Sequence, residues 1–166
     1  MIIGVDSENG YNSYEGAIAM SAVIRLAAYD DLPQLLDLYR HLNEDDPVLD
    51  PDELRDLWEE MLADEWMKII VAQENNILSA SCVLVVVRNL TRGARPYGLI
   101  ENVVTHADYR RRGLGRMVLT RAIELAREHN CYKVMLLTSS RMPGVQEFYE
   151  RCGFQKGVKT GFLYRL

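Results

Sequence analysis

The sequence contains 166 residues, enough for one domain with a proper hydrophobic core. Hydrophobic residues make up 48% and charged residues 26%, which is ordinary for a globular chain. The formal net charge of −5 argues against broad nucleic-acid binding, which needs a basic surface. No apolar run approaches the ~20 residues of a membrane-spanning helix.

The N-terminus and the cysteines indicate in which cellular compartment the protein is expected. Residues 1–16 lack the basic start and apolar middle of a secretory signal. Cys82, Cys131 and Cys152 are too scattered for a disulfide framework, so we expect free thiols in a reducing cytoplasm. The spacing of cysteines and histidines predicts no metal site. Residues 1–20, rich in Gly, Asn, Ser and Tyr, are expected to form an extension ahead of a domain at 21–166.

The first part of that domain predicts one strand and two helices. Residues 22–26 indicate a strand, and Asp30 or Asp31 can cap a helix with Pro33 in its first turn. An acidic turn at 43–47 leads to a second helix over 52–66.

The middle of the chain predicts most of a sheet. Strands are expected at 68–73 and 77–87, followed by a polar loop at 89–96. The β-branched run at 99–105 predicts a third strand of this group, and apolar residues at helical spacing predict a long helix from Leu114 to about 129.

The last part predicts a strand at 131–137 and a short helix from Pro143 to Cys152. A hairpin at 154–158 and 161–165 is expected to close the sheet. This order predicts a single α/β domain with a mixed, mostly antiparallel sheet flanked by helices.

Glycines and arginines gather where the third strand turns into the long helix. The segment Tyr109–Arg116 reads YRRRGLGR, and its two glycines leave backbone amides open at a helix N-terminus. Such amides and the helix dipole favour an anion, which predicts a phosphate cradle. The alternative is a glycine-bearing turn with solvated arginines.

Two known phosphate-binding motifs can be excluded, which narrows the choice of phosphate ligand. Val118 stands where a dinucleotide fingerprint needs its third glycine, and Arg116-Met117 replaces the Lys-Ser/Thr of a nucleoside-triphosphatase loop. The remaining Arg-x-x-Gly-x-Gly pattern resembles the pyrophosphate loop of the GNAT superfamily of acyl-coenzyme A-dependent N-acyltransferases. Phe148–Phe154, read FYERCGF, resembles the family's later Phe-Tyr-x-x-x-Gly-Phe signature. Short local similarity to glucosamine-phosphate N-acetyltransferases appears at 100–104 and 131–133.

The resemblance implies the GNAT fold, with two strands splayed apart at the cofactor site, and acetyl-coenzyme A as co-substrate. It implies that main-chain groups of the strand before the cradle bind the pantetheine arm and that the cradle amides and arginines bind the phosphates. The residues that match are Asn102, Val103, Val104, Thr105, Arg110, Arg111, Arg112, Gly113, Leu114, Gly115 and Arg116. Any single arginine is alternatively only solvated. The family often has Asn at the position of Met142, so Ser139 or Ser140 replaces that contact or it is absent.

Two residues are candidates for catalysis. The resemblance places Tyr149 at the coenzyme A sulfur, where it would also contact the cofactor and protonate the departing thiolate; alternatively it is a core tyrosine. Glu101 is the candidate base for the attacking amine, or a carboxylate satisfied on the sheet face. The acidic stretch Glu44–Asp46 with Asp50 either attracts a cationic acceptor or forms a solvated turn.

The sequence therefore predicts an acetyl-coenzyme A-dependent N-acetyltransferase acting on a primary amine of a small molecule. Small domains of this family often pair, so a homodimer is expected, without nucleic-acid or membrane partners. The alternatives are a non-catalytic acyl-coenzyme A sensor of the same fold and a nucleic-acid binder using Arg110–Arg112. The sequence leaves the amine acceptor open.

Overall fold

A computed structural model describes residues 22–43, 45–138 and 143–166. The expected N-terminal extension, Met142, Ser139, Ser140 and Glu44 lie outside these ranges.

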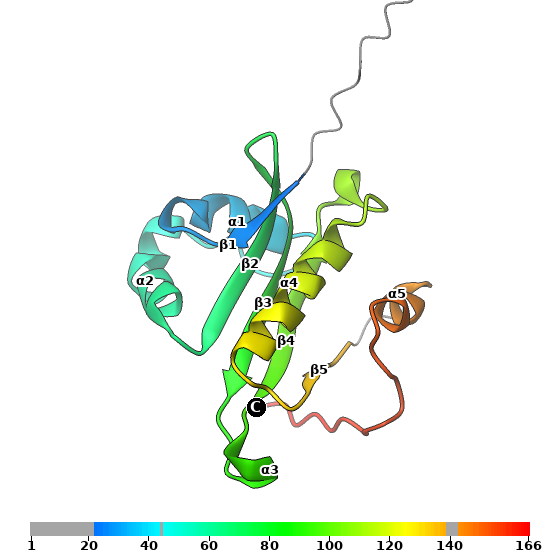
Figure 1. The fold of residues 1–166 in the computed structure, drawn as a ribbon. Coiled ribbons are helices and arrows are strands. Elements are labelled where there is room, and N and C mark those ends of the chain that lie inside the picture. The colour runs from blue at the N-terminus through cyan, green and yellow to red at the C-terminus, as the bar shows by residue number, and fades with distance from the viewer. Residues whose placement is uncertain (1–21, 44, 139–142) are drawn as a thin grey trace, which may run out of the picture.

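A five-stranded sheet runs through the molecule in the order β1-β2-β3-β4-β5 (Figure 1). The first four strands pair antiparallel, and β5 joins β4 in parallel. The sheet is therefore mixed and mostly antiparallel, as predicted. Its strands are β1 (Val23–Leu26), β2 (Met67–Glu74), β3 (Ile77–Val87), β4 (Tyr97–Thr105) and β5 (Val134–Leu136).

Helices cover both faces of this sheet. The longest is α4, and α3 is a single turn whose Arg92 and Gly93 have positive φ angles of 56° and 72°. Short 3-10 helices precede α1, α2 and the cradle, at Tyr29–Asp31, Pro51–Leu54 and Ala107–Tyr109. The helices are α1 (Leu32–Tyr39), α2 (Arg55–Ala63), α3 (Thr91–Ala94), α4 (Leu114–Glu128) and α5 (Val145–Arg151). No helix among the described residues is long and apolar enough to cross a membrane.

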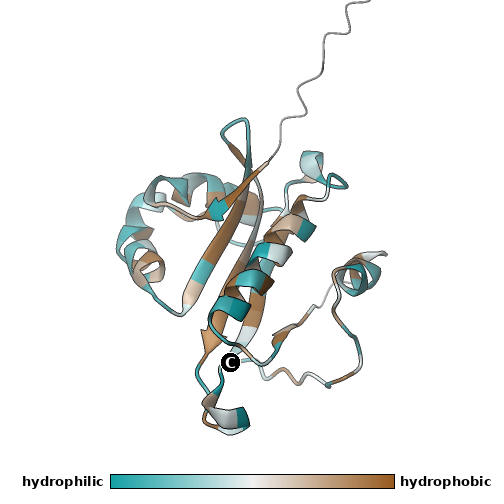
Figure 2. Cartoon of the chain, viewed as in Figure 1, coloured by the Kyte–Doolittle hydropathy of each residue, from teal (hydrophilic) through white to brown (hydrophobic). Residues whose placement is uncertain are grey.

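The two faces of the sheet carry separate cores. On one face α4 packs its buried stripe, which includes Val118, Leu119 and Ala122, against residues such as Leu84 of β3. On the other face α1 and α2 pack Leu35 and similar residues against β2 and β3. Figure 1 shows these helices on opposite sides of the sheet, and Figure 2 shows that β2 and β3 between them are largely hydrophobic. The alternation of β3 side chains between the cores explains why this strand is buried along most of its length.

An ion pair ties the first strand to the first helix. Arg25 of β1 donates to both carboxylate oxygens of Asp31, with Nη2 to Oδ1 at 2.8 Å. The Ala28 N–H donates to Asp31 Oδ2 at 2.7 Å. Burial raises the pKa of Asp31, but these hydrogen bonds outweigh burial and hold the pKa below its ordinary value. Asp31 is therefore an anchor of the turn, where the sequence suggested a simple helix cap.

Most expected elements form, with boundaries that shift by a few residues. The helix expected at 52–66 begins as the 3-10 turn and ends at Ala63, and the strand expected at 131–137 pairs only at Val134–Leu136. The loop expected at 89–96 contains the single turn α3.

The prediction of a hairpin at 154–158 and 161–165 is wrong. Residues 154–166, which we call the C-terminal segment, contain no strand. Positive φ angles at Gly153 and Gly157, 93° and 77°, turn the chain away from the sheet. The short β5 offers little edge for a further strand, so the apolar residues of the segment stay exposed.

Candidate active site

The segment predicted to be the phosphate cradle lies at the N-terminus of α4. Gly113 is the N-cap and has a left-handed conformation with φ 84°, which only glycine adopts readily. No side chain caps the helix, and the first helical bond joins Met117 N–H to Gly113 O at 3.0 Å. The preceding amides of the first turn therefore have no acceptor within the helix, as an anion site requires.

Gly115 explains how the cradle is held against its neighbours. A Cβ at Gly115 would lie 3.1 Å from Thr105 Oγ1 and 3.3 Å from Phe148 Cζ. The absence of a side chain thus lets α4 approach both the end of β4 and α5. The glycine brings the three elements of the predicted site together.

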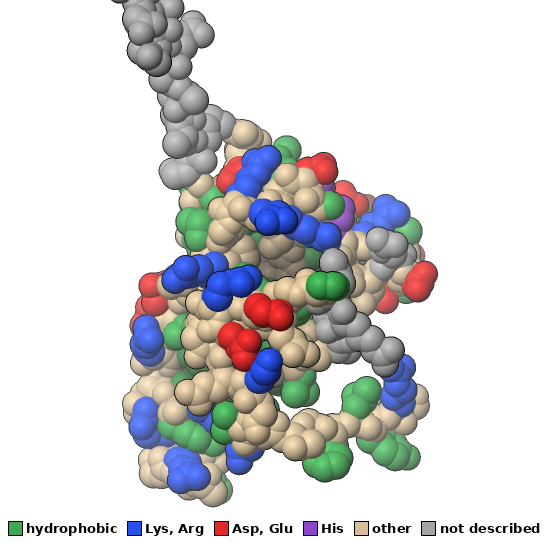
Figure 3. All heavy atoms as spheres, turned by 90° about the vertical axis from the view of Figure 1, so that its right-hand side faces the viewer, with side chains coloured by type: hydrophobic (Ala, Val, Ile, Leu, Met, Phe, Trp, Pro, Cys, Tyr) green, Lys and Arg blue, Asp and Glu red, His purple; other side chains and the backbone are tan. Residues whose placement is uncertain are grey.

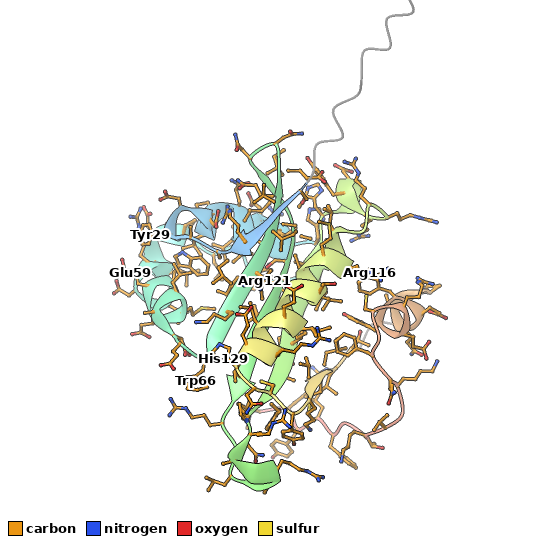
Figure 4. The ribbon with its side chains drawn as sticks, in the orientation of Figure 1. Tyr29, Glu59, Trp66, Arg116, Arg121 and His129 are labelled. Carbon is orange, nitrogen blue, oxygen red and sulfur yellow. The ribbon has the colours of Figure 1, made fainter. Side chains whose placement is uncertain are left out.

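The four cradle arginines divide into two pairs. Arg110 Nε donates to Thr105 O at 3.3 Å, and Arg112 donates to Asp108 O at 3.2 Å and pairs with Glu74 at 3.5 Å. The side chains of Arg111 and Arg116 form no hydrogen bond or ion pair with the described residues, and both residues are exposed. Figure 4 shows Arg116 on the side of α4 that faces α5. Two arginines therefore shape the loop, and two remain available to an anion.

The strand before the cradle carries a bulge. Ser81 pairs with Val104 and Val83 pairs with Glu101, so one residue of β3 lies opposite Asn102 and Val103 of β4. Asn102 has a left-handed φ of 52°. This bulge changes the direction of the main-chain groups at the middle of the candidate site.

The expected splaying of two strands is confirmed. β4 pairs with β5 from Gly98 to Ile100, and the described residues show no pairing with β5 beyond that point. Main-chain groups of 101–105 on that side are thus open to a ligand.

Tyr149 lies in α5 beside this opening. Its half-buried ring packs against the α4 core and lies 5.2 Å from the Phe148 ring, centroid to centroid. Burial raises the pKa of the Tyr149 hydroxyl, and nearby Cys152, Cys82 and Glu101 raise it further. The tyrosine therefore carries its proton at neutral pH, as a general acid must.

Glu101 lies on β4 immediately before the bulge and is half-buried. Its influence on the Tyr149 pKa shows that the two candidate catalytic groups, from β4 and α5, are within electrostatic reach of each other. The two alternatives for each residue, catalytic or structural, are compatible with this placement.

A large cavity of about 1230 Å³ opens on the Tyr149 side of α4. Its wall is formed by α4, β5, α5 and the C-terminal segment. The hollow between that segment and the rest of the chain is visible in Figure 3. Tyr149, Leu136 and Thr138 are among its lining residues.

The acidic loop is built as a local turn. Asn43 donates to the Asp46 carboxylate at 3.1 Å, and Asp50 accepts the Asp52 N–H at 2.9 Å. Asp45, Asp46 and Asp50 are all exposed. These contacts favour the solvated-turn interpretation over an acceptor-binding role.

Sequence reasoning missed two buried hydroxyls beside the bulge, those of Tyr39 and Ser81. Tyr39 fits the apolar stripe of α1, and Ser81 fits a buried strand. Nothing in the sequence therefore indicates that the two hydroxyls lie near each other. The described residues contain no cluster of three or more His, Cys, Asp or Glu side chains that could hold a metal ion.

Comparisons with known proteins agree with this geometry. The model of the acetyltransferase (GNAT) family matches residues 35–154. A probable glucosamine 6-phosphate N-acetyltransferase of Oryza sativa is 40% identical over 94 residues, which are 56% of this chain and 54% of the rice protein. The chain thus spans about half the length of that relative.

Two further similarities cover most of the chain. The glucosamine 6-phosphate N-acetyltransferase of Trypanosoma brucei is 34% identical over 134 residues, 80% of this chain and 88% of the relative. A solved structure of a protein from Agrobacterium tumefaciens, assigned as an acetyltransferase, is 50% identical and superposes with a TM-score of 0.82. That superposition covers 87% of this chain and 99% of the other.

Proposed function

The chain belongs to the acetyltransferase (GNAT) family, and we propose that it transfers the acetyl group of acetyl-coenzyme A to a primary amine of a small molecule. The observation that carries this proposal is the uncapped N-terminus of α4 next to the open edge of β4 and to Tyr149. A diphosphate on the first-turn amides places an attached thioester arm along 101–105, toward Glu101 and Tyr149.

The binding roles follow from that placement. Amides between Arg111 and Arg116 receive the diphosphate, with the Arg111 and Arg116 guanidinium groups as charge-assisted partners. Main-chain groups of Asn102–Thr105 that β5 leaves unpaired bind the pantetheine amides, as an added strand would.

The chemical roles require three proton transfers. Glu101 accepts a proton from the amine, directly or through water, so that the neutral nitrogen can attack the thioester carbonyl. A main-chain N–H near Val103 or Val104 donates to the oxyanion of the tetrahedral intermediate. When the carbon–sulfur bond breaks, the Tyr149 hydroxyl protonates the departing thiolate, and the second proton that the nitrogen loses as the amide forms returns to the Tyr149 oxygen. A direct transfer with no acetylated protein side chain results.

The acceptor is a small amine. The relatives in rice and trypanosome are named for glucosamine 6-phosphate, which makes that amino sugar phosphate the first compound to test. The test is a panel of amines, scored by thiol release from acetyl-coenzyme A. Turnover with one amine, lost in Tyr149→Phe, supports the proposal. Tight acetyl-coenzyme A binding without turnover of any amine favours the sensor of the same fold.

We also propose a homodimer that involves the C-terminal segment. Phe162, Leu163 and Tyr164 are 94%, 81% and 87% exposed, an unusual exposure for neighbouring apolar residues. Because each copy carries both an apolar segment and an open β5 edge, two copies can cover each other by the same contacts. Light scattering at micromolar concentration tests this, and a monomer mass contradicts it.

We also propose that the protein is located in the cytoplasm, on the basis of its thiols. Cys82, Cys131 and Cys152 are all free, which fits a reducing compartment. Labelling of the unfolded protein from cells with a thiol reagent tests whether all three stay reduced.

A further inference from the structure

Three polar side chains from three different elements lie near one another at the β4 bulge. Ser81 pairs with Val104 there. Ser81 and the exposed residue Asn102 both act on the Tyr39 hydroxyl. Tyr39 is the last residue of α1, Ser81 lies in the middle of β3, and Asn102 is the left-handed residue of the bulge. Tyr39 packs in the core on the sheet face that α1 and α2 cover, and these helices lie on the face opposite α4 (Figure 1). None of the three residues has one of the catalytic roles proposed above.

The two hydroxyls are buried without hydrogen-bond partners. The Tyr39 and Ser81 oxygens are both shielded from solvent, and neither forms a hydrogen bond with the described residues. Ser81 as a whole is 0% exposed. Buried polar atoms normally find partners, because leaving one unpaired costs free energy. Phe and Ala at these positions would fill the same core without that cost.

The surroundings of the Tyr39 hydroxyl identify its neighbours. Burial raises the pKa of Tyr39 to about 12, while the adjacent Ser81 hydroxyl and Asn102 side chain lower it by less. Tyr39 therefore carries its proton at neutral pH and presents an O–H donor beside the Asn102 side chain. Hydrogen bonds of catalytic groups are often misaligned before substrate binds and tighten in the complex.

Asn102 links this pair to the reacting atoms. A left-handed conformation is unfavourable for a residue with a Cβ and persists where neighbouring groups hold it. Asn102 lies between Glu101 and Val103, so its conformation sets the direction of both neighbouring peptide groups. The bulge is also the part of β4 that has no partner in β5.

We propose that Tyr39 and Ser81 are positioning residues for acetyl transfer: when acetyl-coenzyme A binds, their hydroxyls form hydrogen bonds to the Asn102 side chain and thereby fix the bulge whose main-chain N–H groups meet the acetyl carbonyl. This inference rests on the proposed function, because it assigns the bulge a role in that reaction. Tyr39 acts through Asn102 and does not itself touch the substrate.

The test compares Tyr39→Phe with Tyr97→Phe, which removes a hydroxyl at the other end of β4. Tyr39→Phe is expected to lower kcat about tenfold with little change in the affinity for acetyl-coenzyme A, the pattern of an interaction made in the transition state. Its melting temperature is expected to stay level or rise, since an unpaired buried hydroxyl is lost. Tyr97→Phe should leave both quantities unchanged. An unaltered kcat in Tyr39→Phe overturns the inference.

A double-mutant cycle and hydrogen exchange separate positioning from general packing. Tyr39→Phe is expected to have no further effect on kcat in an Asn102→Ala background, and Ser81→Ala should reproduce part of its loss. Full additivity contradicts a role through Asn102. Amide exchange at Asn102 and Val103, measured in the acetyl-coenzyme A complex, should accelerate in Tyr39→Phe, and unchanged exchange in that complex overturns the inference without any need for turnover. A wild-type protein that acetylates no amine contradicts the proposed function instead.

Discussion

The sheet with its helices α1, α2 and α4 and the region after β5 are held together in different ways. In the first region, which we call the body, the sheet is packed on both faces, and residues such as Ile70, Leu84 and Val118 are completely shielded from water. In residues 143–166, the C-terminal region, α5 has no buried residue and the C-terminal segment is almost entirely exposed. The anion cradle belongs to the body, whereas Tyr149 belongs to the C-terminal region.

This division separates affinity from turnover. The candidate cradle is formed by the start of α4 and its contact with β4, and α5 touches it through Phe148 at Gly115. The proposed proton donor Tyr149 lies on α5, a helix without buried residues, and packs with Phe148 against the α4 core. Cofactor binding should therefore survive changes in the C-terminal region that abolish catalysis.

The largest effect is expected from a change in the cradle. Gly113→Asp places a carboxylate at the anion site, where open space accommodates it although φ is positive. Acetyl-coenzyme A affinity should fall about 1000-fold, through repulsion and the loss of charge-assisted hydrogen bonds. Calorimetric titration measures it.

Gly93→Asp is the matched control, because Gly93 also has a positive φ and open space but lies in α3. It should lose similar stability and retain normal affinity. Equal affinity of both variants for acetyl-coenzyme A would show that the cradle does not bind the cofactor.

A change in the C-terminal region should affect turnover next. Tyr149→Phe keeps the ring that packs on the core and removes only the hydroxyl, so kcat should fall about 100-fold. The alkaline limb of the wild-type kcat profile should shift or vanish in the variant. Tyr132→Phe, on the wall of the same cavity, is the control. Normal kcat in Tyr149→Phe would leave this residue a core tyrosine.

Some parts of the candidate site could be predicted from the sequence and others could not, and the difference has a physical reason. The cradle was predictable because its glycines and the helix start act locally, within a few residues of Gly113. The Asn102 bulge and the meeting of Tyr39 with Ser81 depend on the register between β3 and β4 and on the docking of α1. Those are contacts between distant segments, which periodicity does not report.

The fold shows the same division. Apolar runs predicted β2 and β3, and apolar residues at helical spacing predicted α4, because each of these elements buries its own pattern against a neighbour. The pattern at 154–165 is equally strand-like, yet a strand also needs an open edge, and β5 supplies only Val134–Leu136. Local sequence does not specify whether that edge belongs to the same chain or to a second copy.

A smaller effect is expected from the exposed apolar segment. Phe162→Asp should weaken self-association about tenfold or more, since burying one large aromatic side chain contributes about 1.5 to 3 kcal/mol. Val48→Asp serves as the control, because Val48 is likewise an exposed apolar residue, with an exposed fraction of 81%, but lies in the loop before α2. Sedimentation equilibrium measures both. Equal dimer dissociation constants in the two variants would exclude the segment from the interface.

The smallest effect is expected in the body, from Asp31. Its folded pKa is lowered, so the ion pair with Arg25 stabilises the fold above the unfolded pKa of about 4 and is lost as pH falls through the folded value. Asp31→Asn should cost about 1 to 2 kcal/mol at pH 7 and flatten the acid loss of stability. Urea unfolding between about pH 2 and about pH 5, the range in which an Asp with a lowered pKa takes up its proton as the pH falls, checks this. A wild-type curve that is flat there would contradict the anchoring role.

The most direct test of the division between body and C-terminal region is the affinity of Tyr149→Phe for acetyl-coenzyme A, measured by calorimetry on the enzyme whose kcat has been determined. The account predicts a dissociation constant within about twofold of wild type beside a kcat that is about 100-fold lower. A parallel loss of affinity and turnover, in a variant that remains folded, would contradict it, because cofactor binding would then depend on the C-terminal region as well as on the cradle.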